Sequence, residues 1–266
     1  MSRERSSEQR TIDWQKLIEE ALTVPGSLGQ TYSKFYNYSF LNQMYLRLQG
    51  VREPVATYQR WQEIGRQVVK GAKAKEIIRP IFAKPEPENK DKEPTPIGFK
   101  SVKCIFTLSE TEGPELPPIA LPEWDEETAL AKLHVRRVRF DLLNGNIQGF
   151  SQGRDIGINP IAANPRKTLV HELGHIVLGH TVRDKTPEIA QHLGIREFEA
   201  ESTAYLTLNE LGQLDEQTAT VSRGYIRHWL DDEHPPDSSI RRVFSATDTI
   251  LKAGRAVVSK VMEGNR

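Results

Sequence analysis

The sequence predicts an α+β protein of two domains, and three features of the chain support this. Apolar residues recur three or four positions apart at 11–21 and 32–48, a spacing typical of amphipathic helices. Segments rich in Val, Ile and Phe at 68–69, 77–78 and 99–108 indicate strands. Residues 113–122 contain four prolines, and helical patterns dominate beyond them. We therefore expect a mixed helix and strand domain, a junction, and then a more helical domain.

The predicted domains occupy residues 11–122 and 123–266. Residues 1–10 are polar and charged, and we expect a flexible tail there. Residues 84–96 hold four prolines among Lys, Glu, Asp and Asn. This composition buries too little apolar surface to offset the entropy lost on ordering, so it predicts a mobile loop between two strands.

Composition limits the class of protein to which the chain belongs. Lys and Arg together number 36, as do Asp and Glu, so no global field points to a nucleic-acid or membrane partner. Cys104 is the sole cysteine, which excludes an internal disulfide and a cysteine-based metal cluster. No uninterrupted apolar run approaches membrane-spanning length. We expect a soluble, cytoplasmic protein in which any metal ligands are His and carboxylates.

Several further elements are expected around one long helix. β-Rich segments at 135–143 and 147–158 flank Asn144-Gly145-Asn146, which predicts a hairpin because Asn and Gly tolerate positive φ. The long helix begins after Asn164-Pro165 and ends at Gly179. Other helices are expected at 57–64, 124–133, 188–193, 198–211, 225–230 and from 239 onward.

The long helix carries His171-Glu172-Leu173-Gly174-His175. The two histidines are four residues apart, so they share a helical face and both imidazoles can reach one metal ion. Glu172 lies beside the open coordination position, where it can take a proton from water. Flanking residues are apolar nearly all round, so the helix is buried and its polar residues need partners. This context favours a zinc peptidase site over a chance coincidence of core histidines.

A catalytic zinc usually has three protein ligands, so a third one must follow in the sequence. His180 is the nearest candidate. It falls on another helical face or just past the helix end, and we expect a capping or solvated histidine there.

Residues 197–201 read Glu-Phe-Glu-Ala-Glu and lie in a predicted helix. Glu197 and Glu201 share one face of that helix, whereas Glu199 points elsewhere. We predict that Glu197 is the third ligand and that Glu201 accepts the remaining N–H of a ligating histidine. An ordinary solvated acidic face is the alternative.

These two motifs together resemble those of glutamate-type zincins, whose later motif is Glu-x-x-Ala-Asp or a close variant. Glu201 stands where that motif has Asp. This form resembles antirestriction proteins of the ArdC type and the related ImmA/IrrE-like peptidases. The resemblance implies a zincin-like metallopeptidase domain at 123–266, with Zn²⁺ held by His171, His175 and Glu197.

Aromatic and basic residues are interleaved in the first domain. Residues 32–40 include five aromatic residues, and residues 47–79 include eight basic residues against three acidic ones. Single-stranded nucleic acid suits this pattern, because its bases stack on rings while its phosphates meet cations. A core aromatic cluster beneath a solvated basic face explains the same composition equally well.

The order of short motifs in this region resembles the ArdC-type single-stranded-DNA-binding domain. The resemblance rests on residues 38–43, 57–61, 65–71 and 105–113, and residues 224–230 resemble a helix of the peptidase partner domain. It implies DNA contacts by Tyr38, Asn42, Arg60, Trp61, Arg66, Lys70 and Lys73.

Two functions are compatible with these patterns. The first is a metallopeptidase that binds a peptide along the edge of the sheet preceding the long helix. Glu172 would be its base. The resemblance to glutamate-type zincins suggests Tyr225 or His228 as the oxyanion stabiliser, and Tyr205 is an equal candidate. The second is a non-enzymatic protein that shields single-stranded DNA during plasmid or phage transfer and holds a structural metal. Glu172 favours the first, since a structural zinc normally has four closed protein ligands and needs no base.

Overall fold

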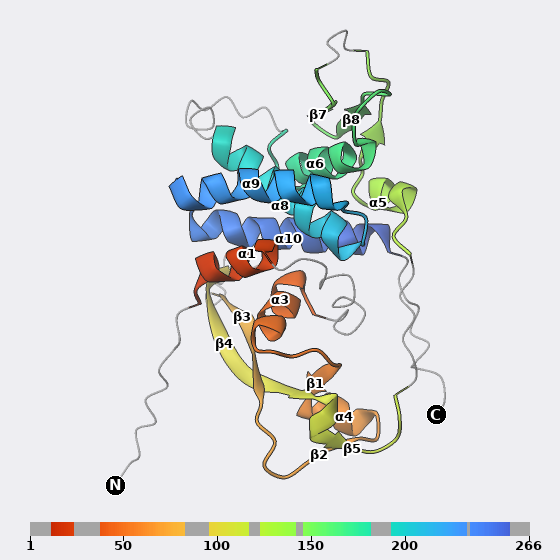
Figure 1. Cartoon of the computed structure of the whole chain (residues 1–266). Helices are drawn as coiled ribbons and strands as arrows, with labels where there is room; N and C mark the ends of the chain where they lie inside the picture. Colours follow the sequence, from red (N-terminus) through yellow and green to blue (C-terminus); the bar gives the residue numbers. More distant parts are fainter. Residues whose placement is uncertain are drawn as a thin grey trace, which may run out of the picture. The chain divides into compact units, whose positions relative to one another are not determined.

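The computed structural model describes residues 12–23, 38–82, 96–116, 123–141, 146–181, 193–232 and 235–255. They divide between two compact units, one within residues 1–13 and 42–117 and the other within residues 14–41 and 118–266 (Figure 1). The sequence analysis placed residues 11–122 in one domain, whereas helix α1 (Trp14–Thr23) belongs to the second unit. The predicted tail at 1–10, nearly all of the loop at 84–96 and most of the helix at 188–193 lie outside the described residues.

A three-stranded antiparallel sheet of order β1-β4-β3 forms the base of the first unit. Its strands are β1 (Val55–Thr57), β3 (Lys75–Phe82) and β4 (Pro96–Thr107). β3 and β4 confirm and extend the predicted strands, whereas β1 was not predicted. Helix α3 (Phe40–Leu48) is fixed to the sheet because both amide atoms of Asn42 bond to the main chain of Ile78, at 2.9 and 2.7 Å.

Two smaller elements complete the first unit. Helix α4 (Tyr58–Glu63) begins at Thr57, whose side chain accepts a hydrogen bond from the Arg60 amide. Strand β2 (Gln67–Val68) pairs with β5 (Thr111–Glu112). Both helix and strand were predicted near these positions.

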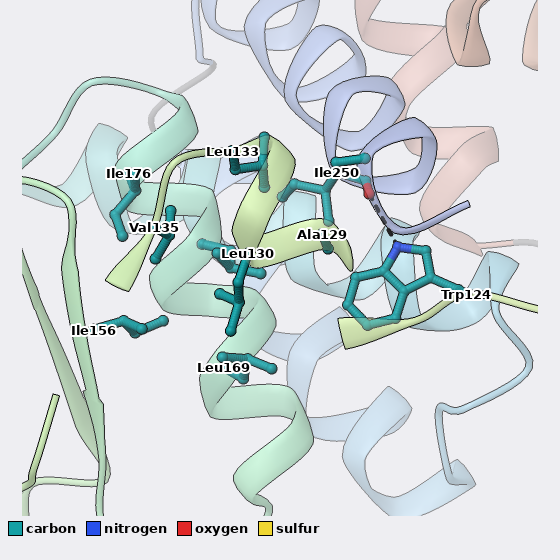
Figure 2. Packing of buried hydrophobic residues seen from close by; sticks show 11 residues of the cluster. Trp124, Ala129, Leu130, Leu133, Val135, Ile156, Leu169, Ile176 and Ile250 are labelled. Carbon is teal, nitrogen blue, oxygen red and sulfur yellow. Dashed lines mark hydrogen bonds between the residues drawn. The ribbon is translucent and has the colours of Figure 1, made fainter. Parts of the chain in front are cut away.

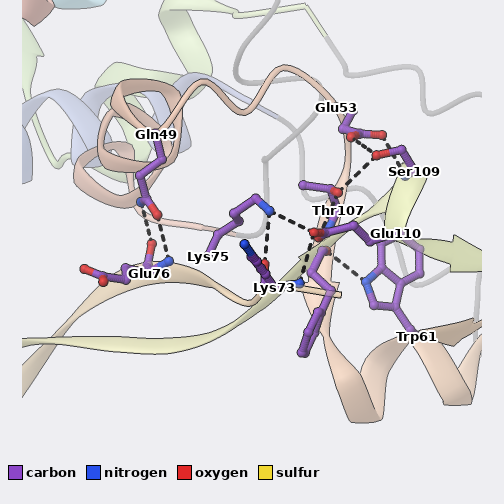
Figure 3. Close-up of polar contacts among 10 residues, drawn as sticks. Gln49, Glu53, Trp61, Lys73, Lys75, Glu76, Thr107, Ser109 and Glu110 are labelled. Atoms are coloured by element: carbon purple, nitrogen blue, oxygen red, sulfur yellow. Dashed lines mark hydrogen bonds and ion pairs between the residues drawn. The ribbon is translucent and has the colours of Figure 1, made fainter. Parts of the chain in front are cut away.

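Glu110 ties the end of β4 to the segment before β3, as Figure 3 shows. Its carboxylate accepts hydrogen bonds from Lys75 Nζ at 2.9 Å, from both the amide and hydroxyl of Thr107, and from the Lys73 amide. Burial alone would raise the pKa of Glu110, but these donors outweigh it and lower the pKa. Glu110 is therefore an ionised structural hub of this unit.

The second unit is assembled around helix α8 (Leu193–Glu210), in which every residue from 198 to 208 is buried. Helices α6 (Pro165–Val177), α9 (Glu216–Asp232), α10 (Asp237–Gly254) and α1 pack against it. α1 contributes the fully buried side chains of Leu17 and Ile18. Polar side chains on such a buried helix are destabilising unless they find partners inside the protein.

α6 is the helix that carries the histidine pair. It begins where predicted, after Asn164, whose side chain accepts a hydrogen bond from the Lys167 amide at 2.9 Å. One face packs into the apolar cluster of Figure 2, which joins α6 to α5 (Glu126–Lys132), α10 and the adjacent sheet. The cluster consists of Trp124, Ala129, Leu130, Leu133, Val135, Ile156, Leu169, Leu173, Ile176, Ile250 and Ala253.

The predicted turn at Asn144-Gly145 lies outside the described residues, but the sheet beside α6 differs from the predicted hairpin in how its strands pair. β6 (Arg136–Arg137) pairs with β8 (Asp155–Ile158) in parallel, while β7 (Gly149–Gln152) pairs with β8 antiparallel. The observed hairpin therefore turns at Gly153-Arg154, inside the segment that the sequence analysis treated as one strand. The sequence analysis missed this short turn because apolar residues lie on both sides of it. The order β6-β8-β7 leaves β7 at an edge of the described sheet.

Trp124 and Gly254 form a close contact that gives a test of the fold. Trp124 Nε1 donates to Ile250 O at 3.0 Å, and a Cβ on Gly254 would overlap the indole ring. We expect Gly254→Ala to lower the free energy of unfolding by about 1–3 kcal/mol, the usual cost of overpacking. Gly224→Ala is the matched control, because a Cβ on that exposed helical glycine meets nothing within 4 Å. Thermal unfolding of both variants checks this, and equal midpoints would contradict it.

No helix among the described residues has the length and apolar character needed to cross a membrane.

Candidate metal centre

Three predicted ligands converge between α6 and α8. His171 Nε2 and His175 Nε2 lie 3.1 Å apart. The Glu197 carboxylate faces both, with one oxygen 3.4 Å from His171 Nε2 and the other 3.4 Å from His175 Nε2. Within the described residues these three side chains form the group whose ligand atoms all lie within 4.8 Å of one another. The i, i+4 spacing on α6 therefore brings the two imidazoles together, as the sequence analysis expected.

Mutual hydrogen bonding perturbs the protonation of this group. Hydrogen bonds to His171 and His175 lower the pKa of Glu197 well below its usual range. Burial alone would lower the pKa of His171, but the carboxylates of Glu197 and Glu201 outweigh it and raise that pKa to about 9. His171 is thus a cation at neutral pH in this arrangement, and it shares its two N–H groups between two carboxylates.

Glu201 lies behind His171, in the position predicted for it. Its carboxylate is 3.2 Å from His171 Nδ1 and accepts hydrogen bonds from Lys167 at 2.7 Å and Ser222 at 2.6 Å. Burial alone would raise the pKa of Glu201, but these partners lower it to about 2. An ionised carboxylate beside Nδ1 of His171 keeps a proton on that nitrogen, so Nε2 is the nitrogen available to a metal ion.

Glu172 stands beside the three converging side chains and is held by the edge strand. Its Oε2 accepts a hydrogen bond from the Ser151 hydroxyl of β7 at 2.5 Å. A cavity of about 830 Å³ opens next to Glu172 and His171 and extends between β7 and the start of α9. Ser151 was not predicted, and nothing in the sequence marks it, because its role depends on how β7 packs beside α6.

His180 requires a correction. A capping or solvated histidine was expected, yet its side chain is only 5% exposed. Its Nδ1 lies 3.0 Å from His175 Nδ1, and its Nε2 lies 2.8 Å from Glu199 Oε2. Glu199 does point away from Glu197, but it points into the protein and is 2% exposed. Helical spacing predicted that Glu199 points away from Glu197, but it did not predict that His180 is the partner of Glu199.

The candidate oxyanion stabilisers are not brought to the cavity. Tyr205 is 1% exposed, and its hydroxyl accepts a hydrogen bond from Arg223 at 3.3 Å. The described residues of α9 that line the cavity are Gln217, Thr218 and Val221. Tyr225 and His228 of the same helix are not among the lining residues.

The predicted DNA-contact residues separate into two groups, and all of them except Tyr38 lie in the first unit. Trp61 is 1% exposed and its Nε1 donates to Phe106 O, while Arg66 is buried and Asn42 holds α3 to β3. These three support the fold, which corrects the expectation that they face a ligand. Tyr38 is half-buried, whereas Arg60, Lys70 and Lys73 are exposed. Tyr58, which was not singled out, is an exposed aromatic residue at 44%.

Arg66 gives a second test of these assignments. Its guanidinium donates to Thr111 Oγ1 at 2.8 Å and to the carbonyls of Thr111, Gly113 and Pro114. Arg66→Ala leaves these acceptors unpaired, and we expect the free energy of unfolding to fall by about 1–3 kcal/mol. Arg60→Ala removes only an exposed ion pair with Glu63 and should cost less than about 1 kcal/mol. Urea denaturation compares the two, and a larger effect at Arg60 would contradict the assignment.

Comparison with known proteins found a matching domain family and similar crystal structures. Residues 5–114 match the N-terminal domain of anti-restriction factor ArdC. Two crystal structures of the antirestriction protein ArdC from plasmid R388, one metal-free and one Mn(II)-bound, are similar to the chain at 21% sequence identity and a TM-score of 0.50. The alignments cover 92% of this chain and 96% or 98% of theirs, which shows a shared fold. No relative among curated proteins reached significance.

The family match and the fold agree with each other and with the order of motifs along the sequence. Residues 5–114 therefore match the N-terminal domain of the ArdC family, and the chain shares its fold with the ArdC structures.

Proposed function

We propose that the second unit is a zinc-dependent metallopeptidase of the glutamate-zincin type. We propose further that the first unit binds single-stranded DNA and that the protein serves antirestriction in a mobile element. One observation carries the peptidase proposal. The Nε2 atoms of His171 and His175 and the carboxylate of Glu197 face one another, with Glu172 held beside them by Ser151.

The donor set fits a divalent ion, and zinc in particular. Two imidazole nitrogens and one carboxylate are a common catalytic zinc set, which leaves one position for water or substrate. Glu197 is 45% exposed, so the group is open to solvent on its side, as a catalytic site requires and a closed structural site does not. The ArdC relative with bound Mn(II) supports the expectation of a divalent ion in this family.

Each residue then has a defined task. The ion, when bound, would polarise the carbonyl of a scissile peptide bond and increase the acidity of a nearby water. Glu172 takes a proton from that water and delivers it to the leaving amine. Ser151 holds the Glu172 carboxylate in place. The outer edge of β7 receives the substrate main chain as an added strand, and the cavity beside His171 receives a substrate side chain.

Cleavage of an unfolded protein tests the peptidase proposal. The full chain would be stripped of metal and incubated with a denatured protein mixture, with and without stoichiometric zinc. New peptide termini identified by mass spectrometry should appear only with zinc and should vanish when a chelator is added. Identical fragment patterns with and without zinc would contradict the proposal.

Charge on the first unit supports the DNA proposal. Its described residues 12–13, 42–82 and 96–116 include ten Lys or Arg against seven Asp or Glu. The basic residues at 52, 60, 70, 73, 79, 100 and 103 are exposed. Exposed Tyr58 lies on α4 with Arg60, and its ring is in edge contact with Phe106. Cations together with an exposed ring suit a strand whose bases are unpaired.

A salt series separates DNA binding from non-specific association. Anisotropy of a labelled oligothymidine should rise on binding, and the logarithm of affinity should fall linearly with the logarithm of salt concentration. Joint replacement of Lys70 and Lys73 by Ala should reduce the slope by about 1.4, since each phosphate contact contributes about 0.7 on single strands. Lys16→Ala, in the second unit, is the control. A salt-independent signal or no binding would contradict the proposal.

A further inference from the structure

His180 lies beside the candidate metal centre, and its position in the sequence does not predict this. α6 ends at Val177, and Gly179 adopts a left-handed φ of +77°. This conformation lets the chain turn back, and the His180 amide donates to His175 O at 2.8 Å. The two imidazole rings consequently lie with centroids 5.1 Å apart at an interplanar angle of 65°.

The contacts of His180 are on the far side of His175 from the candidate ion position. His175 directs its Nε2 to Glu197 and to His171, and its Nδ1 to His180. His180 therefore contacts the nitrogen that does not take part in the converging group. This excludes His180 as a fourth ligand in this arrangement.

Hydrogen-bond directions in this chain follow from simple proton counting. A histidine that holds an ion through Nε2 must carry its proton on Nδ1. His175 then donates from Nδ1, so the Nδ1 of His180 accepts. His180 must in turn carry its proton on Nε2, where Glu199 Oε2 accepts it at 2.8 Å. The three nitrogen and oxygen contacts of the series are matched in this direction, and the Arg242 guanidinium, which also lies 3.4 Å from His180 Nε2, then directs its N–H groups to Glu199 and to Leu178 O.

Glu199 is fixed at the end of this series. It lies on α8, two residues from Glu197, and Arg242 of α10 approaches its carboxylate to 3.3 Å. Arg242 also donates to Leu178 O at 2.6 Å, at the end of α6. The three helices α6, α8 and α10 thus meet at one polar cluster, in which His180 and Glu199 are buried and Arg242 is exposed.

The two histidines of α6 are oriented by different means. His171 Nδ1 meets the carboxylate of Glu201 directly, whereas His175 Nδ1 reaches Glu199 only through the ring of His180. We propose that His180 and Glu199 are positioning residues, which hold the proton of His175 on Nδ1 and present its Nε2 to a metal ion. This inference rests on the proposed function only for the presence of the ion, and proteolysis is not required.

Zinc affinity of the full metal-free chain, measured by competition with a chromophoric chelator, tests this role. His180→Leu keeps much of the volume of the side chain but removes the acceptor, and the affinity should fall about 10- to 100-fold, as it does when such orienting partners are lost. His180→Asn places an amide oxygen near the original Nδ1 and should recover most of the affinity. Glu199→Leu should lose affinity like His180→Leu.

Glu210→Leu is the matched control for Glu199→Leu. Glu210 is equally buried at the other end of the same helix, eleven residues or about 16 Å away along the axis. Its replacement should leave the zinc affinity unchanged. Thermal unfolding of each metal-free variant records any loss of folding separately from the loss of metal.

Several outcomes would overturn the proposal. One is zinc affinity within twofold of the parent in His180→Leu, and another is His180→Asn binding as weakly as His180→Leu. Equal losses in Glu199→Leu and Glu210→Leu would also overturn it, because the effect would then be structural. A chain that binds zinc with this pattern but cleaves no peptide overturns the proposed peptidase and leaves the positioning role intact.

Discussion

Glu172→Gln is expected to reduce kcat/KM for peptide cleavage by about 10²- to 10⁴-fold, the contribution typical of a general base. The Gln side chain keeps the size of the Glu and can still accept a hydrogen bond from Ser151, but it cannot take up a proton at neutral pH. His171, His175 and Glu197 are untouched, so zinc should bind as in the parent. DNA binding, which the first unit carries in our proposal, should also be unchanged.

The rate of cleavage of a peptide identified in the zinc-dependent assay measures this effect. Glu127→Gln is the control, because it makes the same chemical change at an exposed position of α5. Full cleavage by Glu172→Gln would refute the role of Glu172 as base. Full antirestriction activity without cleavage would instead favour the alternative function, in which the protein shields single-stranded DNA and the metal is structural.

Zinc affinity is expected to rise about tenfold for each pH unit between pH 6.5 and 8.5, or about 100-fold over the range. The carboxylates of Glu197 and Glu201 raise the pKa of His171 to about 9, so below that pH the ion must displace a proton from His171 Nε2. The gain should level off as the pH passes about 9, where the imidazole is already neutral. Chelator competition at each pH, corrected for protonation of the chelator, measures the slope.

Glu201→Gln provides the matched comparison. It removes one of the two carboxylates that raise the pKa of His171, so the rise in affinity should end at a lower pH. The metal-free protein should show the opposite trend in stability. A histidine whose pKa is raised on folding stabilises the protein below its unfolded pKa of about 6.5, and this contribution is lost as the pH rises through about 9. Zinc affinity independent of pH would contradict both expectations.

The helical faces that carry the ligand group could be predicted from sequence, because they depend on local helical geometry. His171 and His175 are one turn apart, as are Glu197 and Glu201, and a turn of helix has the same shape in any protein. The contacts of His180, Glu199 and Ser151 depend on how α6, α8 and β7 pack together. Spacing along the chain carries no information on such packing, so these partners were misjudged or missed.

The errors in the first unit have a related cause. Trp61 and Arg66 belong to residue types that contact nucleic acid, and the resemblance selected them for that reason. Both types also serve as buried anchors when their N–H groups find acceptors, here Phe106 O and the carbonyls after β5. Composition does not distinguish these uses. The hairpin at Gly153-Arg154 escaped prediction because a two-residue turn is brief beside the stronger Asn144-Gly145-Asn146 signal.

The position of α1 has a consequence for how the protein is made. Its buried residues Leu17 and Ile18 belong to the second unit, whose other described elements lie beyond residue 117 apart from the start of α3. A ribosome therefore releases α1 long before α8 and α10 exist to cover it, and the first unit can fold in the interval. The second unit is then completed only after α10 has emerged. A truncated chain that begins at residue 123 would lack this cover and expose an apolar strip on α10, which favours aggregation.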